Sequence, residues 1–251
     1  MCRNEADIVG HTIRHLLAQG IDGIIVVDNL SVDGTRETLT KLADDDPRIF
    51  VGTDSLDAYH QGRKMSYLAH LARKAGADWV IPFDADEFWF ARESSVADYL
   101  RSLEGVPVAK AELTDLHPLT VTGIDLENSN EQVQIEDNAN SKKVALRPHR
   151  WVWIDNGNHT ALDLGREVPS DLRIAHLPSR SIQQMERKAR VGAAAIAKVE
   201  DAPANFGHHW KTTAALDREL LYRQWSERIA TSRGDLARIP TVWKTWTDRG
   251  Q

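Results

Sequence analysis

The chain has 251 residues and a formal net charge of -6 at neutral pH. This length is enough for one large domain with a substantial core. Hydrophobic residues make up 41% and charged residues 27% of the chain, as in an ordinary soluble globular protein. The sequence pI of about 5.9 argues against a general nucleic-acid surface, which would need a basic excess.

Cysteine content and apolar runs limit the cellular setting. The single cysteine, Cys2, excludes an intramolecular disulfide and fits a reducing compartment. The apolar runs are too short to cross a bilayer, and the charged start lacks the apolar core of a signal peptide. We therefore expect a cytoplasmic protein, with peripheral contact on the inner membrane face as an option. The start resembles the middle of a strand, so a missing N-terminal segment is an open alternative.

The first hundred residues alternate between helical and strand periods. The predicted helices are 8–17, 35–43 and 62–75, and the predicted strands are 24–27, 48–52 and 78–83. This alternation predicts right-handed crossovers and an α/β fold with a mostly parallel sheet, in which ligands bind beyond the carboxyl ends of the strands. Asp28 and Asp84 each follow a predicted strand, so we expect both to open onto one cleft.

The pattern changes after residue 113. The polar segment 127–143 is typical of a long mobile loop or insertion. Two further strands are expected at 143–147 and 172–176. Two long helices follow at 181–199, with Ser181 as the N-terminal cap, and at 214–230.

The sequence IPFDADEFW carries the clearest chemical pattern. Alternate residues of an extended segment point the same way, so Asp84 and Asp86 are expected to face one site together. Mg²⁺ and Mn²⁺ prefer oxygen ligands and commonly bind one or two carboxylates together with substrate phosphates. Such a metal stabilises the negative charge that grows on a departing nucleoside diphosphate. A solvated acidic strand end is the alternative interpretation.

Three segments in this order, RNEADI, VVDNLSVDGT and WVIPFDADEFW, resemble the family 2 glycosyltransferases with the GT-A fold. The likeness extends to the bacterial subgroup whose metal motif reads Asp-x-Asp-Glu-Phe, and it covers at least residues 2–90. The resemblance implies that Arg3, Asn4 and Glu5 line the nucleotide base site and that Asp28 contacts the base or ribose. Capping of a helix or turn is the alternative role for Glu5 and Asp28. Leu30 departs from the pattern, because a small residue is usual there.

A downstream group, His176, Arg180, Ser181 and Lys188, is similar to a late His-Ser-Lys group in the same subgroup. The resemblance implies His176 as a third metal ligand, beside Asp84 and Asp86, and basic side chains on the diphosphate. A structural histidine beside a solvated basic helix is the alternative. Arg63 is a further candidate for a phosphate contact.

The segment WVWIDNGNH, residues 151–159, is a candidate wall for the acceptor. Tryptophan faces stack on sugar rings, and Asp155 or His159 could take the proton of an acceptor hydroxyl. Asp115 is another candidate base. Core tryptophans beside a polar turn are the alternative interpretation. The family resemblance implies inversion by direct displacement.

We therefore predict a GT-A domain, Rossmann-like, with a mixed and mostly parallel sheet flanked by helices. Its nucleotide-sugar half is 1–112, its acceptor half is 113–200, and a helical extension spans 201–251. The predicted activity is Mn²⁺- or Mg²⁺-dependent hexosyl transfer from a UDP-, GDP- or dTDP-sugar to a glycan, lipid-linked or small-molecule acceptor.

Other classes fit less well. The glycine patterns of dinucleotide-binding and P-loop enzymes are absent. A non-catalytic protein that binds nucleotide or carbohydrate on the same fold remains the main alternative. The C-terminal helix and the tail with Trp243 and Trp246 could instead contact a membrane or a second copy of the chain, although such a face usually docks on its own domain.

Overall fold

A computed structural model describes residues 1–128, 131–162, 165–200, 203, 205–231 and 234–238. The aromatic tail with Trp243 and Trp246 lies outside these residues, so its predicted contact surface stays a prediction. Among the described residues, no helix is long and apolar enough to span a membrane.

The N-terminal part alternates helices with two strands, much as the sequence predicts. Its elements are α1 (Val9–Ala18), β1 (Ile24–Asp28), α2 (Thr35–Asp45), β2 (Ile49–Thr53) and α3 (Gln61–Lys74). Strands β1 and β2 pair in parallel, with Ile24 opposite Ile49. Cys2 adds a parallel bridge to Asp28, so the start of the chain lies beside the end of β1.

The rest of the chain forms a larger mixed sheet and the last helices. The elements are β3 (Glu87–Ala91), α4 (Val96–Ser102), β4 (Val108–Pro118), β5 (Gln132–Leu146), β6 (Trp153–Ile154), β7 (Ala161–Leu162), β8 (Glu167–His176), α5 (Ile182–Ile196), α6 (His208–Ala214), α7 (Arg218–Thr231) and β9 (Leu236–Arg238). The sheet has the order β3-β8-β4-β5-β9. Strands β4 and β8 are parallel, and the other neighbours are antiparallel.

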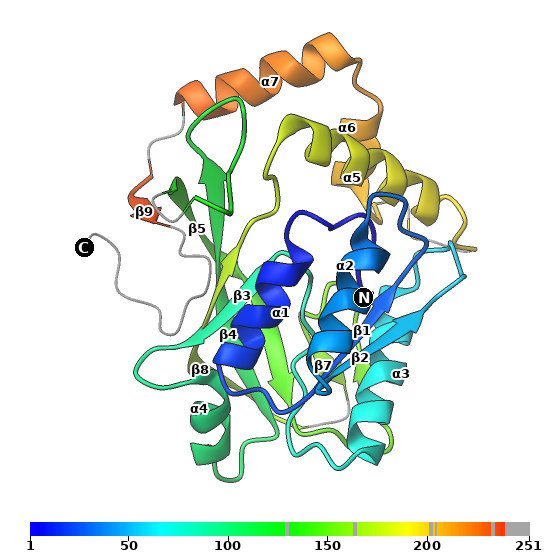
Figure 1. Cartoon of the computed structure of the whole chain (residues 1–251), viewed down its shortest axis with the longest axis vertical. Helices are drawn as coiled ribbons and strands as arrows, with labels where there is room; N and C mark the ends of the chain where they lie inside the picture. The colour runs from blue at the N-terminus through cyan, green and yellow to red at the C-terminus, as the bar shows by residue number, and fades with distance from the viewer. Residues whose placement is uncertain (129–130, 163–164, 201–202, 204, 232–233, 239–251) are drawn as a thin grey trace.

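Helices cover the strands, as expected for an α/β fold. In Figure 1, α1 and α2 lie in front of the sheets, α4 lies at the lower end, and α5, α6 and α7 gather at the upper end. The largest core cluster joins both parts of the chain, with Ile13 of α1, Val26 of β1, Trp89 of β3 and Ile174 of β8. The predicted mixed sheet flanked by helices is therefore confirmed.

The predicted strand at 78–83 is wrong in position. Val80 makes a single antiparallel bridge to Leu146, and the next strand begins only at Glu87. A turn separates the two, because the Glu87 amide donates to the Asp84 carbonyl at 3.1 Å. Asp84 and Asp86 therefore precede β3 instead of ending a strand.

The predicted loop at 127–143 is also wrong for most of its length. Residues 132–146 form the long strand β5, which pairs with β4 along most of its length. Its polar composition hid a strand whose buried face includes Val133, Ile135 and Val144. The helix predicted at 214–230 begins at Arg218, after the separate short helix α6.

At Gly62, helix α3 lies very close to the backbone of β6 and of the turn that follows it. A Cβ at Gly62 would lie 2.6 Å from the Ile154 carbonyl oxygen, whereas a Cβ at Gly10 meets only side-chain atoms, at 3.4 Å or more. Both glycines are the second residue of a helix. We expect Gly62→Ala to lower the melting temperature clearly and Gly10→Ala to leave it unchanged or raise it slightly. Equal melting temperatures of the two variants would contradict this close contact.

Candidate functional site

The Asp86 carboxylate is the meeting point of two cationic side chains and a histidine. Asp86 lies in the turn before β3, and its side chain is only 3% exposed. Lys188 of α5 donates to Asp86 Oδ2 at 2.5 Å. His176 Nε2, at the end of β8, lies 3.7 Å from Asp86 Oδ1, and Arg180 Nη1 lies 3.8 Å from Oδ2. The sequence-predicted residues His176, Arg180 and Lys188 are thus brought together at Asp86.

Asp115 fixes the orientation of His176. The two residues are partners in the parallel pairing of β4 with β8, and His176 Nδ1 lies 2.6 Å from Asp115 Oδ1. An ionised carboxylate only accepts, so this geometry places the hydrogen on Nδ1 and leaves Nε2 facing Asp86. A carboxylate behind a histidine in this way is the usual support of a metal-ligating imidazole.

The charges of this cluster shift each other's protonation. Burial alone would raise the pKa of Asp86, but Lys188, His176 and Arg180 together hold that pKa below its ordinary value. Burial lowers the pKa of His176, yet Asp86 and the bond to Asp115 raise it overall. The cluster therefore holds Asp86 as a carboxylate and Lys188 as an ammonium, whose pKa Asp86 raises against the effect of burial.

Asp84 belongs to a second network. Its Oδ1 accepts from Gln61 Nε2 at 2.9 Å and from Asn158 Nδ2 at 3.2 Å. Its Oδ2 lies 2.8 Å from Lys143 Nζ, which also lies 2.7 Å from Glu87 Oε1. Lys143 and Glu87 are 6% and 0% exposed, so this is a buried cation between two acids.

Asp84 and Asp86 are not alternate residues of a strand, so the geometric reason for expecting them at one site is absent and their meeting at one site stays a prediction. The turn that starts at Asp84 breaks the extended conformation on which that expectation depended. As a result the two carboxylates pair with different lysines, Lys143 from β5 and Lys188 from α5.

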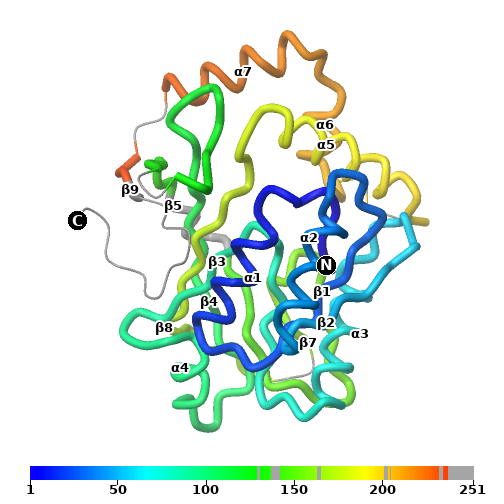
Figure 2. Tube along the Cα trace, viewed as in Figure 1, coloured from blue at the N-terminus to red at the C-terminus, as the bar shows by residue number. Residues whose placement is uncertain are grey.

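Arg180 joins the start of the chain to the connection between β8 and α5. Its Nε donates to Asp7 Oδ2 at 2.7 Å, and its Nη2 donates to Glu5 and to Asp7 Oδ1. Burial raises the pKa of Glu5, and Arg180 opposes that rise. Figure 2 shows these two stretches of chain passing each other beside the start of α1. Arg180 is 2% exposed, so these buried ion pairs hold the start of the chain against the β8–α5 connection.

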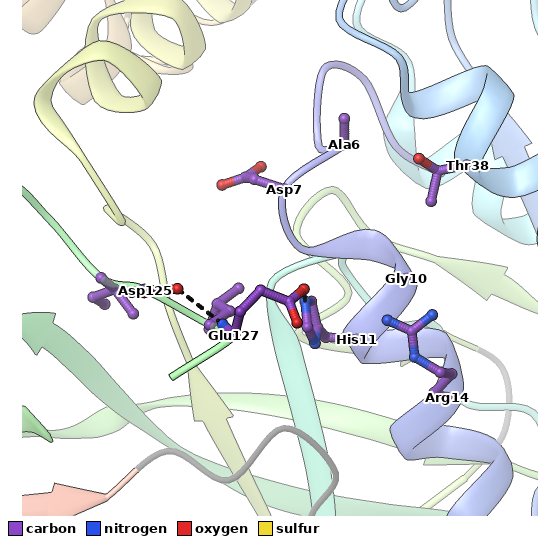
Figure 3. A pocket seen from close by; sticks show the side chains of 10 residues that line it. Ala6, Asp7, Gly10, His11, Arg14, Thr38, Asp125 and Glu127 are labelled. Carbon is purple, nitrogen blue, oxygen red and sulfur yellow. Dashed lines mark hydrogen bonds and ion pairs between the residues drawn. The ribbon is translucent and has the colours of Figure 1, made fainter. Parts of the chain in front are cut away.

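A pocket of about 460 Å³ lies beside the ion pair of Arg180 with Asp7, between α1, α2 and the loop before β5. Figure 3 shows Asp7, His11 and Arg14 along the start of α1, with Asp125 opposite them and Glu127 reaching across to His11, whose Nε2 lies 3.1 Å from Glu127 Oε1. Two of its lining residues contact Arg180: Asp7 through its carboxylate, and Ile124 through its amide, which donates to the Arg180 carbonyl at 2.8 Å. The pocket therefore adjoins the Asp86 cluster.

The residues expected at the nucleoside surround the end of β1. Asp28 is 5% exposed, and its Oδ1 is buried without a hydrogen-bond partner among the described residues. Arg3 pairs with Asp57, and Asn4 Oδ1 accepts from the Val32 amide at 2.8 Å. Asn4 therefore holds the loop that contains Val32, whereas one carboxylate oxygen of Asp28 accepts no hydrogen bond from the described residues.

Leu30 has a left-handed backbone, with φ of 56°, and is exposed. A residue with a branched side chain is uncommon in this conformation, in which glycine and asparagine are favoured. Leu30, where the family resemblance implies a small residue, therefore has a backbone conformation that leucine seldom adopts.

The turn between β6 and β7 reaches Asp84. Besides the bond from Asn158, the Gly157 amide donates to Gln61 Oε1 at 2.8 Å, and the Gly62 amide donates to Asn156 Oδ1 at 2.9 Å. The predicted acceptor segment therefore contacts the DADEFW turn directly.

The two candidate bases in this segment support the turn. Asp155 Oδ1 accepts from the Thr160 amide at 2.8 Å, and His159 Nδ1 lies 2.8 Å from the Lys142 carbonyl oxygen. Trp151 and Trp153 are exposed, so the alternative that they are core residues is wrong. Arg63 lies on the exposed side of α3, where no contact connects it with Asp84 or Asp86.

Three of these residues were not foreseen from the sequence: Gln61, Lys143 and Asn158. Lys143 lay at the edge of the segment expected to be a loop, and no motif marks Gln61. The signal available for Asn158 was its place in a Gly-Asn turn, which favours a left-handed backbone; its φ is 59°.

The donor set near Asp86 fits a divalent cation only in part. The described residues hold no group of three His, Cys, Asp or Glu side chains arranged for a metal ion. Asp86 Oδ1 and His176 Nε2 nevertheless face each other, with Asp115 behind the imidazole. An oxygen and an imidazole nitrogen are a chemically suitable pair for Mn²⁺, whose further ligands would be phosphate and water.

Residues 1–94 match the family model described as Glycosyl transferase family 2. With the helix-flanked mixed sheet, this match identifies the fold as the GT-A type. No curated protein matches the chain in sequence.

Two solved structures resemble the chain weakly. The mannosyltransferase PcManGT from Pyrobaculum calidifontis, in complex with GDP-Man and Mn2+, is 15% identical with a TM-score of 0.46; the match covers 92% of this chain and 74% of that one. HddC from Yersinia pseudotuberculosis is 11% identical with a TM-score of 0.37, over 68% of this chain and 80% of that one.

Lys143 can be tested as the buried counter-ion of Asp84 and Glu87. We expect Lys143→Met to lower the free energy of unfolding by about 3–5 kcal/mol at pH 7, because it leaves the buried Glu87 carboxylate and the partly buried Asp84 carboxylate without their cation. The neighbouring Lys142→Met should cost little, since Lys142 has no carboxylate within ion-pair distance in the described part of the chain.

The same variant has an expected pH dependence. Burial raises the pKa of Glu87, and Lys143 opposes that rise. Without Lys143 the folded protein binds protons at these acids more tightly than the unfolded chain does. The difference in stability between Lys143→Met and the wild type should therefore shrink as the pH falls from 7 towards 5. Denaturant unfolding at both pH values measures it, and a constant difference would contradict the assignment.

Proposed function

We propose that this protein is a metal-dependent glycosyltransferase that moves a sugar from a nucleotide-diphosphate sugar to an acceptor by direct displacement with inversion. The observation that carries the proposal is Asp86, buried among Lys188, Arg180 and an imidazole that Asp115 orients. The family match over residues 1–94, which includes this turn, supports the same reaction class.

Asp86 and His176 are the residues that would hold Mn²⁺ or Mg²⁺, with Asp84 in the same turn. The bound metal would supply positive charge to the leaving nucleoside diphosphate. Lys188 carries its own positive charge at the same place. With a cation on the Asp86 carboxylate, the Lys188 ammonium would be available to donate to diphosphate oxygens.

We assign binding of the donor's nucleoside to the C-terminal end of β1. Asp28 offers a buried acceptor oxygen that suits a donor group of a base or ribose. Arg3, Asn4 and Glu5 line the same end of the strand in this proposal. A pocket that recognises a nucleoside in this way needs a buried polar atom awaiting a partner, because an unpaired one is otherwise costly.

The acceptor side is assigned to the β6–β7 turn. Asp155 and His159 are the proposed bases, and each has one atom already engaged in supporting the turn. Asp115 serves as a positioning residue for His176 in this proposal, because its carboxylate already binds the imidazole.

Asp86→Asn is the direct test of the reaction. We expect it to abolish Mn²⁺-dependent turnover of the donor, because the amide loses the charge that a divalent cation needs. The control is Asp78→Asn, an exposed acid eight positions earlier, which should retain full activity. Purified protein is assayed with UDP-, GDP- and dTDP-sugars, with and without Mn²⁺. Unchanged turnover in Asp86→Asn would overturn the proposal, and nucleotide binding without turnover of any donor would favour a binding protein.

Asp115→Asn tests the support of the imidazole. Loss of such a carboxylate typically weakens metal binding by about 10–100-fold, so we expect a drop of this size in Mn²⁺ affinity. Calorimetric titration of Mn²⁺ in the presence of UDP, GDP or dTDP measures it. Glu112→Gln, an exposed position on the same strand, should bind Mn²⁺ as the wild type does. Loss of turnover with unchanged Mn²⁺ affinity would instead indicate that Asp115 is the base.

A further inference from the structure

The side chain of Gln61 connects three separate stretches of the chain. Gln61 is the first residue of α3 and is buried. Its Nε2 donates to Asp84 Oδ1 at 2.9 Å. Its Oε1 accepts from the Gly157 amide at 2.8 Å and from the Tyr59 hydroxyl at 2.6 Å. These distances are those of normal hydrogen bonds, so both polar ends of the side chain are held.

These partners determine the orientation of the Gln61 amide. A carboxylate only accepts, so the atom beside Asp84 has to be the nitrogen. A backbone amide only donates, so the atom beside Gly157 has to be the oxygen. Burial raises the pKa of the Tyr59 hydroxyl, which therefore keeps its proton and donates as well. The position thus requires a side chain with one donating and one accepting end.

Asn158 closes a ring of hydrogen bonds with Gln61. It follows Gly157 in the β6–β7 turn, and its Nδ2 donates to the same Asp84 oxygen at 3.2 Å. Asp84, Gln61 and two consecutive residues of the turn are therefore linked without a gap. The β6–β7 turn reaches Asp84 twice, once through Asn158 directly and once through the Gln61 amide.

Other contacts already anchor α3 to the hairpin of β6 and β7. The Gly62 amide donates to Asn156 Oδ1 at 2.9 Å. Ser66 Oγ, one turn further along α3, accepts from the Ile154 amide at 2.8 Å. Docking of the helix is therefore provided without Gln61, and what Gln61 adds is the bond to Asp84.

We propose that Gln61 is a positioning residue, which holds the Asp84 carboxylate in place against the β6–β7 turn. It acts on the transfer step through Asp84 and does not itself contact substrate. This inference rests on the proposed function, in which Asp84 lies on the donor side and the turn on the acceptor side. The separation of the two sides matters, because a displacement of about 1 Å can cost roughly 100-fold in rate.

Gln61→Met tests this role, because methionine has a similar length but no N–H donor and only a weak acceptor. We expect kcat for Mn²⁺-dependent release of nucleoside diphosphate from UDP-, GDP- or dTDP-sugars to fall roughly 10–100-fold. The donor KM and the Mn²⁺ affinity should stay within about twofold of the wild type, because the lost interaction acts mainly in the transition state. The control is Gln183→Met, the same change at an exposed position of α5, which should match the wild type.

Calorimetric titration with Mn²⁺ and nucleotide separates a loss of rate from a loss of folded protein. The stoichiometry of binding counts the competent molecules, and we expect it to be the same in Gln61→Met and the wild type. A fall in kcat that equals the fall in stoichiometry would make Gln61 a structural residue only, which would overturn the inference.

Hydrogen exchange provides a readout that needs no turnover. The Gly157 amide donates to Gln61, so its exchange, measured by NMR, should become roughly tenfold or more faster in Gln61→Met. The Ile154 amide donates to Ser66 instead and should exchange as in the wild type. Unchanged exchange at Gly157 would overturn the inference, because the turn would then be held without Gln61.

The kinetic outcomes distinguish failure of this inference from failure of the proposed function. A wild type that turns over the donor, together with equal turnover by Gln61→Met, would overturn the positioning role alone. A raised donor KM with unchanged kcat would do the same, because it would assign Gln61 to donor binding. A wild type that turns over none of the three donors would contradict the proposed function and remove the role of Gln61 with it.

Discussion

Three carboxylates lie within four residues at one turn: Asp86 and Glu87 are buried, and Asp84 is partly buried. Burial of a charge is tolerated only where an opposite charge and hydrogen bonds replace water. No nearby part of the sequence supplies these cations. They come from Lys143 of β5 and Lys188 of α5, so the C-terminal half has to fold onto this turn before the turn is stable. The joint core of both halves, which includes the fully buried Trp89, is consistent with that demand.

The same charges connect stability with the proposed chemistry. Lys188 and Arg180 compensate Asp86 in the structure, and both are groups that suit phosphate oxygens. Arg180 is already committed to Glu5 and Asp7, whereas Lys188 has Asp86 as its partner. Lys188 is therefore the cation whose partner can change when a ligand enters, and Arg180 is the one that keeps the N-terminal segment in place.

Much of the fold was predictable because local patterns decide it. The helices at α1, α2, α3 and α5 and the strands β1 and β2 follow from apolar spacing, glycine and the Ser181 cap. The long strand β5 was missed, because its polar residues mask a buried face that only pairing with β4 defines. The turn at Asp84 was missed for a related reason: a hexapeptide with alternating acids looks extended until a hydrogen bond across it is known.

By itself the sequence determined which chemical groups are present: an acidic pair in DADEFW, a late histidine followed by basic residues, and a tryptophan-rich turn. It also determined the resemblance through which these groups acquire candidate roles. The tertiary structure decided which of them meet. It paired Asp84 and Asp86 with different lysines, placed Asp115 behind His176, and brought Asn158 to Asp84. Such pairings join residues about 60 to 100 positions apart, and the energy that selects them comes from burial and charge compensation in the folded chain.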